Sequence, residues 1–194
     1  MNYKIVALMG KAGSGKDSVL HSLIKLAPEL HEIVSCTTRP PREGEVDGIN
    51  YHFLTHDDFA EQLNNGQMLE VAIFRGWCYG TSFANLDETK INIGVFNPTG
   101  VENLMEFDNI DILPVYLIAK DKTRVMRQLM RENDPDVKEI IRRFSTDEDD
   151  FNDINNDSDD DGLDRNDRVG KNYSFEIIYN YKQATKYNQY TDPG

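Results

Sequence analysis

The sequence predicts an α/β fold in which a mainly parallel sheet is flanked by helices. Short apolar runs alternate with longer amphipathic segments, which is the pattern of strand–helix units around a parallel sheet. A glycine-rich turn joins the first apolar run to the first amphipathic segment, and residues 35–81 break the alternation. Because 194 residues suffice for one domain with its own core, we expect residues 35–81 to form a small inserted lobe.

Apolar runs and capping residues indicate the elements of the first half of the chain. Residues 3–9 are apolar and end at glycines, as a buried strand does. A helix over 16–26 follows, with its apolar residues in one stripe. Further expected elements are strands at about 32–37, 51–54, 68–74 and 77–79, a helix from residue 56 capped by Thr55, and a hairpin turn at Arg75-Gly76.

The second half of the chain continues the alternation. Strands are expected at 90–97 and 112–119, with a helix at 98–107 between them. A helix over 121–131 follows, and its apolar residues are expected to face inward: Val125, Met126, Leu129 and Met130. A further helix at about 137–150 and a last strand at 175–180 complete the prediction.

The charge of the chain is concentrated in one segment. The formal net charge is −13, and residues 147–168 hold eleven Asp or Glu and two Arg. Nucleic-acid binding needs clustered Lys and Arg, and a membrane span needs roughly 20 apolar residues, so neither partner is expected. Cys36 and Cys78 lack the spacing of a disulfide framework or a metal site. A reducing cytoplasm is the expected compartment.

The glycine-rich turn has the pattern Gly-x-x-x-x-Gly-Lys between a strand and a helix. Its members are Gly10, Lys11, Ala12, Gly13, Ser14, Gly15 and Lys16. Glycines allow backbone N–H groups to wrap a phosphate, the helix N-terminus adds positive potential, and the lysine reaches the β- and γ-phosphates. The pattern therefore predicts a nucleotide phosphate site that includes the next residues, Asp17 and Ser18. Asp17 stands where a magnesium-binding Ser or Thr is usual, and its carboxylate can still hold Mg²⁺.

Residues 35–81 contain a second set of polar side chains. Arg39 and Arg42 lie three residues apart in a proline-rich segment, and two guanidinium groups can chelate a phosphate, to which Tyr51 and Tyr79 can also donate. The alternative is a solvated, charged loop. Glu70 stands in an apolar strand, where it is either paired or turned to the surface.

Residues 35–81 closely resemble the guanylate kinase family. The family pattern Ser-x-x-Thr-Arg-x-x-Arg-x-Gly-Glu-x-x-Gly-x-x-Tyr-x-Phe occurs here from Ser35 to Phe53, and Gly-x-x-Leu-Glu and Tyr-Gly-Thr follow in order. The resemblance covers about residues 3–144 and 175–183. It implies a P-loop kinase that transfers the γ-phosphoryl group of MgATP to GMP or dGMP, acting as a monomer or homodimer.

The resemblance also implies a division of the chain and roles for its residues. The core comprises 1–34 and 82–194, with a lid at about 130–142 and an acidic insertion at 147–168, and the lobe at 35–81 binds GMP. Glu70 reads the N1 and N2 donors of guanine. The other residues implied at the GMP site are Ser35, Arg39, Arg42, Tyr51, Tyr79, Gly80, Thr81 and Asn97, the last standing where the family usually has Asp.

Arginines in the expected lid complete the pattern. Arg124, Arg127 and Arg131 share one helix face. The resemblance implies that Arg127 binds ATP and that Arg131 and Arg143, like Lys16 and Arg39, act in transfer, with Arg142 as a substitute for Arg143. It also implies that Asn180 lies near the adenine.

Three alternatives are open. Ribose 1,5-bisphosphate phosphokinases also have a Gly-x-Gly-Lys-Asp-Ser loop and an Asn at the place of Asn97, but they lack the Arg39/Arg42 pair and the base-reading Glu. Guanylate kinase-like modules that bind peptides typically have degraded loops, whereas Lys16 is intact here. The third concerns the insertion, where residues 157–162 resemble the start of a calcium loop but Arg168 replaces the closing Glu.

Overall fold

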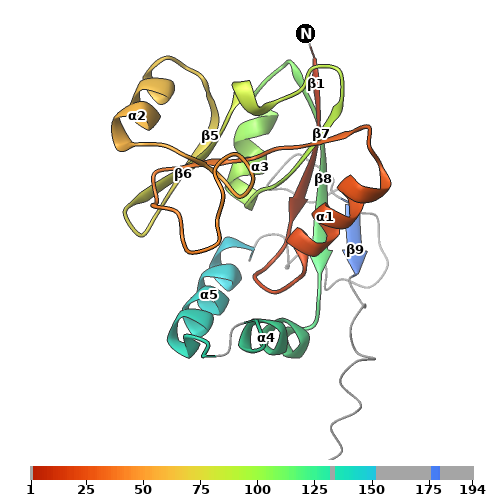
Figure 1. Ribbon diagram of the computed structural model, residues 1–194. Helices are drawn as coiled ribbons and strands as arrows, with labels where there is room; N and C mark the ends of the chain where they lie inside the picture. The colour runs from red at the N-terminus through yellow and green to blue at the C-terminus, as the bar shows by residue number, and fades with distance from the viewer. Residues whose placement is uncertain (1, 132–133, 152–175, 180–194) are drawn as a thin grey trace, which may run out of the picture. The chain divides into compact units, whose positions relative to one another are not determined.

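The computed structural model describes residues 2–131, 134–151 and 176–179. Its strands and helices alternate along most of the chain (Figure 1). In chain order they are β1 (Tyr3–Met9), α1 (Lys16–Leu26), β2 (Leu30–Glu32), β3 (Cys36–Thr37), β4 (His52–Phe53), α2 (His56–Asn64), β5 (Met68–Phe74), β6 (Trp77–Ser82), a 3₁₀ turn (Phe83–Asn85), β7 (Ile91–Val95), α3 (Pro98–Met105), β8 (Ile110–Ile118), α4 (Asp121–Leu129), α5 (Val137–Asp150) and β9 (Glu176–Tyr179).

The first sheet confirms the predicted parallel α/β fold. Its strand order is β2-β7-β1-β8-β9, and β1 pairs in parallel with β7, as β2 does with β7 and β8 with β9. The crossovers from β1 to β2 and from β7 to β8 run in opposite directions across this order. Because such crossovers are right-handed, they put α1 and α3 on opposite faces of β1 and β7, as Figure 1 shows.

A second sheet forms where the strand–helix alternation breaks. Its order is β4-β3-β6-β5, with an antiparallel hairpin of β5 and β6. Arg75 and Gly76 make the hairpin turn with φ angles of 53° and 79°, so the turn predicted there is confirmed. Beside the sheet, α2 buries Phe59 against Cys36 and Met68. The Thr55 hydroxyl caps α2 by accepting a hydrogen bond from the Asp58 N–H, as predicted.

The chain forms two compact units. The first comprises Met1–Leu8 and Asp17–Pro114 and contains the whole second sheet. The second comprises Met9–Lys16 and the described residues from Val115 onward, and therefore contains the glycine-rich loop, α4 and α5. In this second unit, Tyr116 of β8 stacks on Phe151 with ring centroids 5.4 Å apart. None of the described helices is long and apolar enough to span a membrane.

One expected strand divides into two. The run predicted as a strand at 32–37 contains only Glu32 of β2 together with Cys36 and Thr37 of β3, and these two strands belong to different sheets. β2 pairs with β7, while β3 pairs with β4 and β6. The apolar residues Ile33 and Val34 lie between β2 and β3 and belong to neither strand, so the apolar run did not mark the break. The two strands are separated by their pairing partners.

The predicted inward face of α4 is wrong. Met126 and Met130 are 40% and 53% exposed, and Val125 and Leu129 are half-buried. The buried residue of α4 is Arg124, which is 1% exposed. A buried guanidinium needs charged or polar partners, and Arg124 has them from three segments of the chain, as described below.

We expect Phe59→Ala to lower the free energy of unfolding by about 3–5 kcal/mol, because it empties the centre of the cluster with Cys36 and Met68. Leu63→Ala on the same helix is the matched control: Leu63 is 49% exposed and should change stability by about 0.5 kcal/mol or less. Urea unfolding of both variants measures the difference. Equal losses would contradict the assignment of Phe59 to the core of this sheet.

Candidate functional site

The glycine-rich loop lies between β1 and α1, where the sequence predicted it. The Ser14 N–H donates to the Lys11 carbonyl at 3.0 Å, which closes a tight turn. α1 begins at Lys16, whose Nζ donates to the Gly10 carbonyl at 2.6 Å. The lysine thus curls over the loop that precedes it, and its charge lies beside the loop backbone. This combination of amides, helix N-terminus and ammonium group is suited to phosphate oxygens.

Gly13 shows why the loop needs glycine. Its φ is 78°, and a Cβ added there would lie 2.6 Å from the carbonyl oxygen of Arg124. A larger residue would therefore have to displace the backbone of α4. The backbones of the loop and of α4 are therefore in close contact at Gly13.

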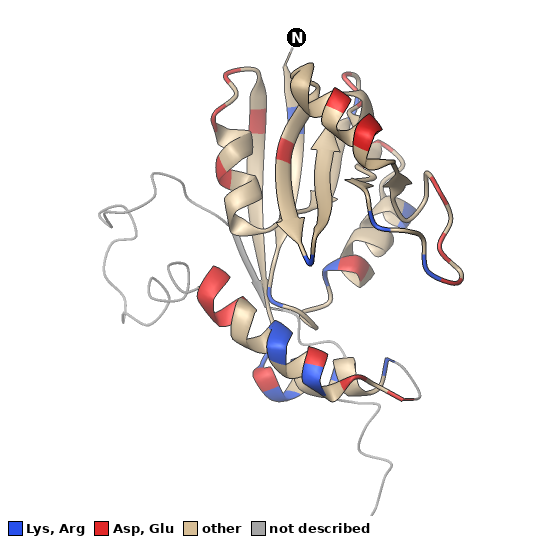
Figure 2. Cartoon of the chain, turned by 90° about the vertical axis from the view of Figure 1, so that its left-hand side faces the viewer, with Lys and Arg blue, Asp and Glu red and all other residues tan. Residues whose placement is uncertain are grey.

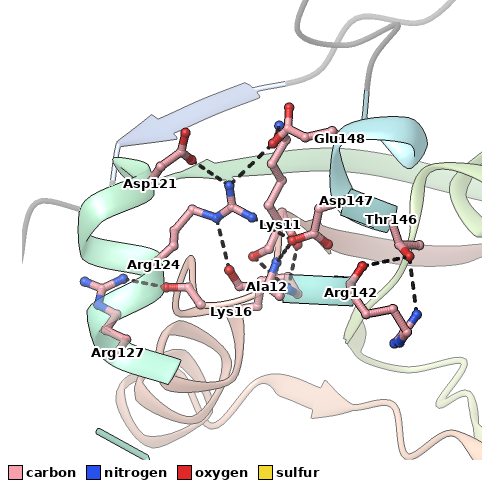
Figure 3. A network of polar contacts seen from close by, with 12 residues as sticks. Lys11, Ala12, Lys16, Asp121, Arg124, Arg127, Arg142, Thr146, Asp147 and Glu148 are labelled. Atoms are coloured by element: carbon pink, nitrogen blue, oxygen red, sulfur yellow. Dashed lines mark hydrogen bonds and ion pairs between the residues drawn. The ribbon is translucent and has the colours of Figure 1, made fainter. Parts of the chain in front are cut away.

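Arginines of α4 donate to the carbonyls of the loop (Figure 3). Arg127 donates to the Gly13 and Ser14 carbonyls at 3.0 and 2.9 Å. Arg124 donates through Nε to the Ala12 carbonyl at 3.0 Å. Arg127, predicted to bind ATP, is therefore in contact with the loop itself. The structure thus gives both arginines a role in fixing the loop backbone.

A carboxylate of α5 contacts the same loop. Asp147 Oδ2 accepts hydrogen bonds from the Ala12 N–H at 2.7 Å and from Arg124 at 2.6 Å. Burial raises the pKa of Asp147 above its ordinary value, although the Ala12 N–H and Arg124 both act to lower it. Next to it, Glu148 pairs with Lys11 at 2.6 Å. The sequence interpretation missed Asp147 because it assigned residues 147–168 to an acidic insertion.

The predicted lid arginines lie on exposed or half-exposed positions. Arg142 and Arg143 both donate to Glu139, at 2.8 and 2.9 Å. These hydrogen bonds, Arg142 first, lower the pKa of Glu139 to about 2. Arg131 is exposed just beyond the end of α4. Figure 2 shows that the first part of α5 carries basic residues beside the acidic Glu139, and that acidic residues occupy its C-terminal end.

In the first unit, the structure brings together three of the residues predicted to hold the acceptor phosphate. The guanidinium of Arg39 lies 5.6 Å from the ring centre of Tyr51, and Tyr51 and Tyr79 have ring centroids 6.0 Å apart. Glu45 accepts from Arg39 at 2.9 Å and from the backbone N–H of Arg42 at 2.7 Å. Burial raises the pKa of Tyr51, so its phenol remains a donor at neutral pH. The alternative of a freely solvated loop does not fit Arg39, whose side chain is 10% exposed.

Glu70 is paired and not turned to the surface. It lies on β5 opposite Thr81 of β6, whose hydroxyl donates to Glu70 Oε1 at 2.9 Å. Thr81 is fully buried, and burial raises the pKa of Glu70. In the same sheet, Gly80 pairs with Cys36. Ser35, just before β3, accepts through its carbonyl from the His52 N–H at 2.9 Å.

Asn97 lies near Gly100, as Glu70 does. It caps α3, because its Oδ1 accepts from the Gly100 N–H at 2.7 Å. A Cβ added at Gly100 would lie 2.9 Å from Asn97 Oδ1 and 3.6 Å from Glu70 Oε2. The two side chains therefore converge on Gly100. Since the cap engages the oxygen of Asn97, the amide of this residue presents its NH₂ group.

Asp17 and Ser18 are exposed in the first turn of α1. The charge of Asp17 is one of the causes that raise the pKa of Tyr51, after burial and Tyr79, so this carboxylate lies within electrostatic reach of the Arg39 cluster. Among residues 2–131, 134–151 and 176–179, no group of three or more His, Cys, Asp and Glu could hold a metal ion. An exposed carboxylate such as Asp17 fits Mg²⁺, which usually keeps several waters and takes few protein ligands. Asn180 and residues 152–168, with the calcium-like run, lie outside the described residues.

Three comparisons with known proteins all find similarity to the same family. The sequence pattern of the family described as guanylate kinase matches residues 2–174. The guanylate kinase of Campylobacter jejuni is 29% identical over 189 residues, covering 94% of this chain and 91% of that protein. The guanylate kinase of Helicobacter hepaticus is 30% identical over 144 residues, 72% of each chain. A crystal structure of guanylate kinase from Anaplasma phagocytophilum has a TM-score of 0.54 at 26% identity, covering 66% of this chain and 67% of that one.

These matches favour the guanylate kinase interpretation over the ribose bisphosphate phosphokinase and peptide-binding alternatives. They extend through the loop at 10–16, the second sheet and α5, which are the parts whose geometry is described above. Proteins with these matches are nucleoside-monophosphate kinases. The chain belongs to the guanylate kinase family.

Proposed function

We propose that this chain transfers the γ-phosphoryl group of ATP to GMP or dGMP and releases ADP with GDP or dGDP. The observation that carries the proposal is the arrangement of side chains on the second sheet and its adjoining loop in the first unit. It combines a partly buried carboxylate, Glu70, with a cluster of Arg39, Tyr51 and Tyr79. An acceptor-only group and a phosphate-binding group in one small lobe are what a guanine nucleotide requires.

The donor nucleotide would be held by the loop of the second unit. Its amides and Lys16 provide fixed donors for the β- and γ-phosphates, and Arg127 and Arg124 support the loop carbonyls. This support matters because phosphoryl transfer depends mainly on positioning and charge stabilisation. We expect Arg131 and Arg143 to add positive charge to the transferring group, with residues 130–142 acting as a lid.

The acceptor would be held in the lobe at 35–81. Arg39 and Arg42 would bind its phosphate, with phenol donors from Tyr51 and Tyr79. Glu70, in its ionised form, would accept from the N1 and N2 donors of guanine, while adenine presents an acceptor at N1. Ser35, Gly80 and Thr81 would complete the base site.

Magnesium would enter with ATP. Asp17 would hold the ion, directly or through water, beside the phosphates. When bound, Mg²⁺ supplies neutralisation of the developing phosphate charge. The carboxylate in place of a hydroxyl adds negative charge to the site, which the loop amides and Lys16 have to offset.

The first experiment measures ADP release with MgATP and a panel of acceptors: GMP, dGMP, AMP, UMP and ribose 1,5-bisphosphate. We expect turnover with GMP and dGMP alone. Lys16→Ala should lower kcat by about 100-fold or more, because it removes the charge nearest the transferring phosphates. Glu70→Gln should raise the KM for GMP by about tenfold or more, because the amide offers a donor where the base also has donors.

Two exposed residues provide matched controls. Lys25→Ala changes a lysine in the last turn of α1, and Glu61→Gln changes a glutamate on α2. Both should keep the wild-type constants within about twofold. Turnover of the bisphosphate alone would reject the guanylate kinase proposal, and so would wild-type kinetics of Lys16→Ala and Glu70→Gln.

Asn97 provides a test of how the base is read. In Asn97→Asp, one carboxylate oxygen can keep the bond from the Gly100 N–H while the other becomes an acceptor for the 2-amino group of guanine. We expect the KM for GMP to fall by about three- to tenfold at pH 8, which is far above the ordinary pKa of a carboxyl group. IMP, which lacks the 2-amino group, is the control acceptor. An equal change for GMP and IMP would show that Asn97 does not read this group.

The pKa of Glu70 predicts a pH dependence. Burial raises it above the ordinary 4.5, so the carboxylate gains a proton as the pH falls toward that value from neutrality. Since only the ionised form accepts two donors from guanine, the KM for GMP should rise as the pH falls from 7 toward 5. The phosphate of GMP also titrates in this range, at about 6. Glu70→Gln shares that titration, and the ratio of the two KM profiles therefore isolates Glu70. A ratio independent of pH would contradict the role of Glu70.

A further inference from the structure

A buried ion pair ties the glycine-rich loop to both helices that follow β8. Asp147 Oδ2 of α5 accepts from the Ala12 N–H at 2.7 Å and from the Arg124 guanidinium at 2.6 Å (Figure 3). Arg124 of α4 also donates to the Ala12 carbonyl at 3.0 Å. We call Ala12, Arg124 and Asp147 the loop joint. Its hydrogen bonds involve both the N–H and the carbonyl of Ala12. All three residues lie in the second unit.

The joint is well enclosed. Arg124 is 1% exposed and the side chain of Asp147 is 15% exposed. The guanidinium also lies over the ring of Phe144, 4.3 Å from its centroid, and donates to Asp121 at 2.7 Å. Arg124 is therefore in contact with residues of α4, α5 and the loop.

Stability alone does not account for the joint. Burying two charges costs free energy that their attraction often fails to recover, and apolar residues of similar volume are commonly as stable or more so. An amphipathic α4 could place an apolar side chain at residue 124, as the sequence pattern had suggested for its neighbours. The joint, however, gives directed bonds to the N–H and C=O of Ala12, which no apolar side chain can give.

The joint also lies close along the helices to the arginines proposed to act in transfer. On α5, Asp147 follows Arg143 by four residues, so the two side chains lie on one face, one turn apart. On α4, Arg124 precedes Arg127, which donates to the Gly13 and Ser14 carbonyls. A helix moves as a rigid element over one turn. Fixing Asp147 therefore restricts the position of the Arg143 side chain.

We propose that the loop joint positions the phosphate loop and Arg143 for phosphoryl transfer, so that Arg124 and Asp147 are positioning residues. This inference rests on the proposed kinase function. Neither side chain needs to touch substrate. A misplacement of about 1 Å can cost about 100-fold in rate, so a loosened joint should lower kcat even where the fold is intact.

The decisive variant removes both charges. Arg124→Met with Asp147→Ala leaves no unpaired buried charge, so we expect it to fold with a Tm within about 5 °C of the wild type. Its kcat should fall by about tenfold or more, while its KM for GMP should stay within about twofold, because the acceptor residues belong to the other unit. The Kd for MgATP, measured by calorimetry without acceptor, should rise by about threefold or more.

Two single variants accompany it. Asp147→Ala alone strands the Arg124 charge and should lower the Tm more than the double variant does. Asp149→Asn is the matched control, since it removes one negative charge from an exposed residue of the same helix turn. It should leave kcat, the Kd for MgATP and the Tm unchanged.

The outcomes separate this inference from the proposed function. A double variant that folds and keeps the wild-type kcat and Kd for MgATP would show that the joint has only a packing role. That result would overturn the inference and leave the proposed kinase function intact. A higher kcat or tighter MgATP binding would overturn it too, because Asp147 would then compete with a phosphate for the Ala12 N–H. If wild-type protein fails to phosphorylate GMP, the proposed function fails, and the Kd for MgATP alone decides: a rise in the double variant supports the joint, and an unchanged value refutes it.

Discussion

The second unit depends on how the peptide groups of a short glycine-rich loop are satisfied. Between β1 and α1 the carbonyls of Ala12, Gly13 and Ser14 leave regular structure, and α4 supplies guanidinium donors to all three. Backbone groups of this kind are costly to leave without partners away from water. Arg124 and Arg127 of α4 therefore satisfy the loop carbonyls whether or not a substrate is bound. The need of these carbonyls for donors explains why α4 buries Arg124, although the helix also contains apolar residues that are less buried.

The sequence predicted the fold well wherever the period of the hydrophobic residues agrees with the positions of capping and turn residues. The first strand, the helix after the glycines, the Thr55 cap and the Arg75-Gly76 turn were all found as expected. Prediction failed where long-range partners decide. The division of 32–37 between two sheets depends on which strands pair, and the burial of Arg124 depends on an acid 23 residues away. Neither is a property of a local window.

The candidate site shows the same division. A family pattern identified Glu70, Arg39 and Tyr79, and the structure gives each of them polar or aromatic neighbours within the first unit. Asp147 was missed because eleven acids in 22 residues look like one solvated segment. A signal did exist: Asp147 falls within the helix predicted at 137–150, on the same face as Arg143. Charge density outweighed helical spacing in that interpretation.

The acidic residues divide by the direction in which folding moves their pKa. Arginine partners lower the pKa of Glu45 and Glu139, so each stabilises the fold above its ordinary 4.5, and the gain disappears as the pH falls below that value. Burial raises the pKa of Glu70 and Asp147, so each binds its proton more tightly when folded and costs stability at neutral pH. A chain selected for stability alone would replace the second pair. Because one faces the proposed base site and the other holds the loop, the cost falls where function requires a carboxylate.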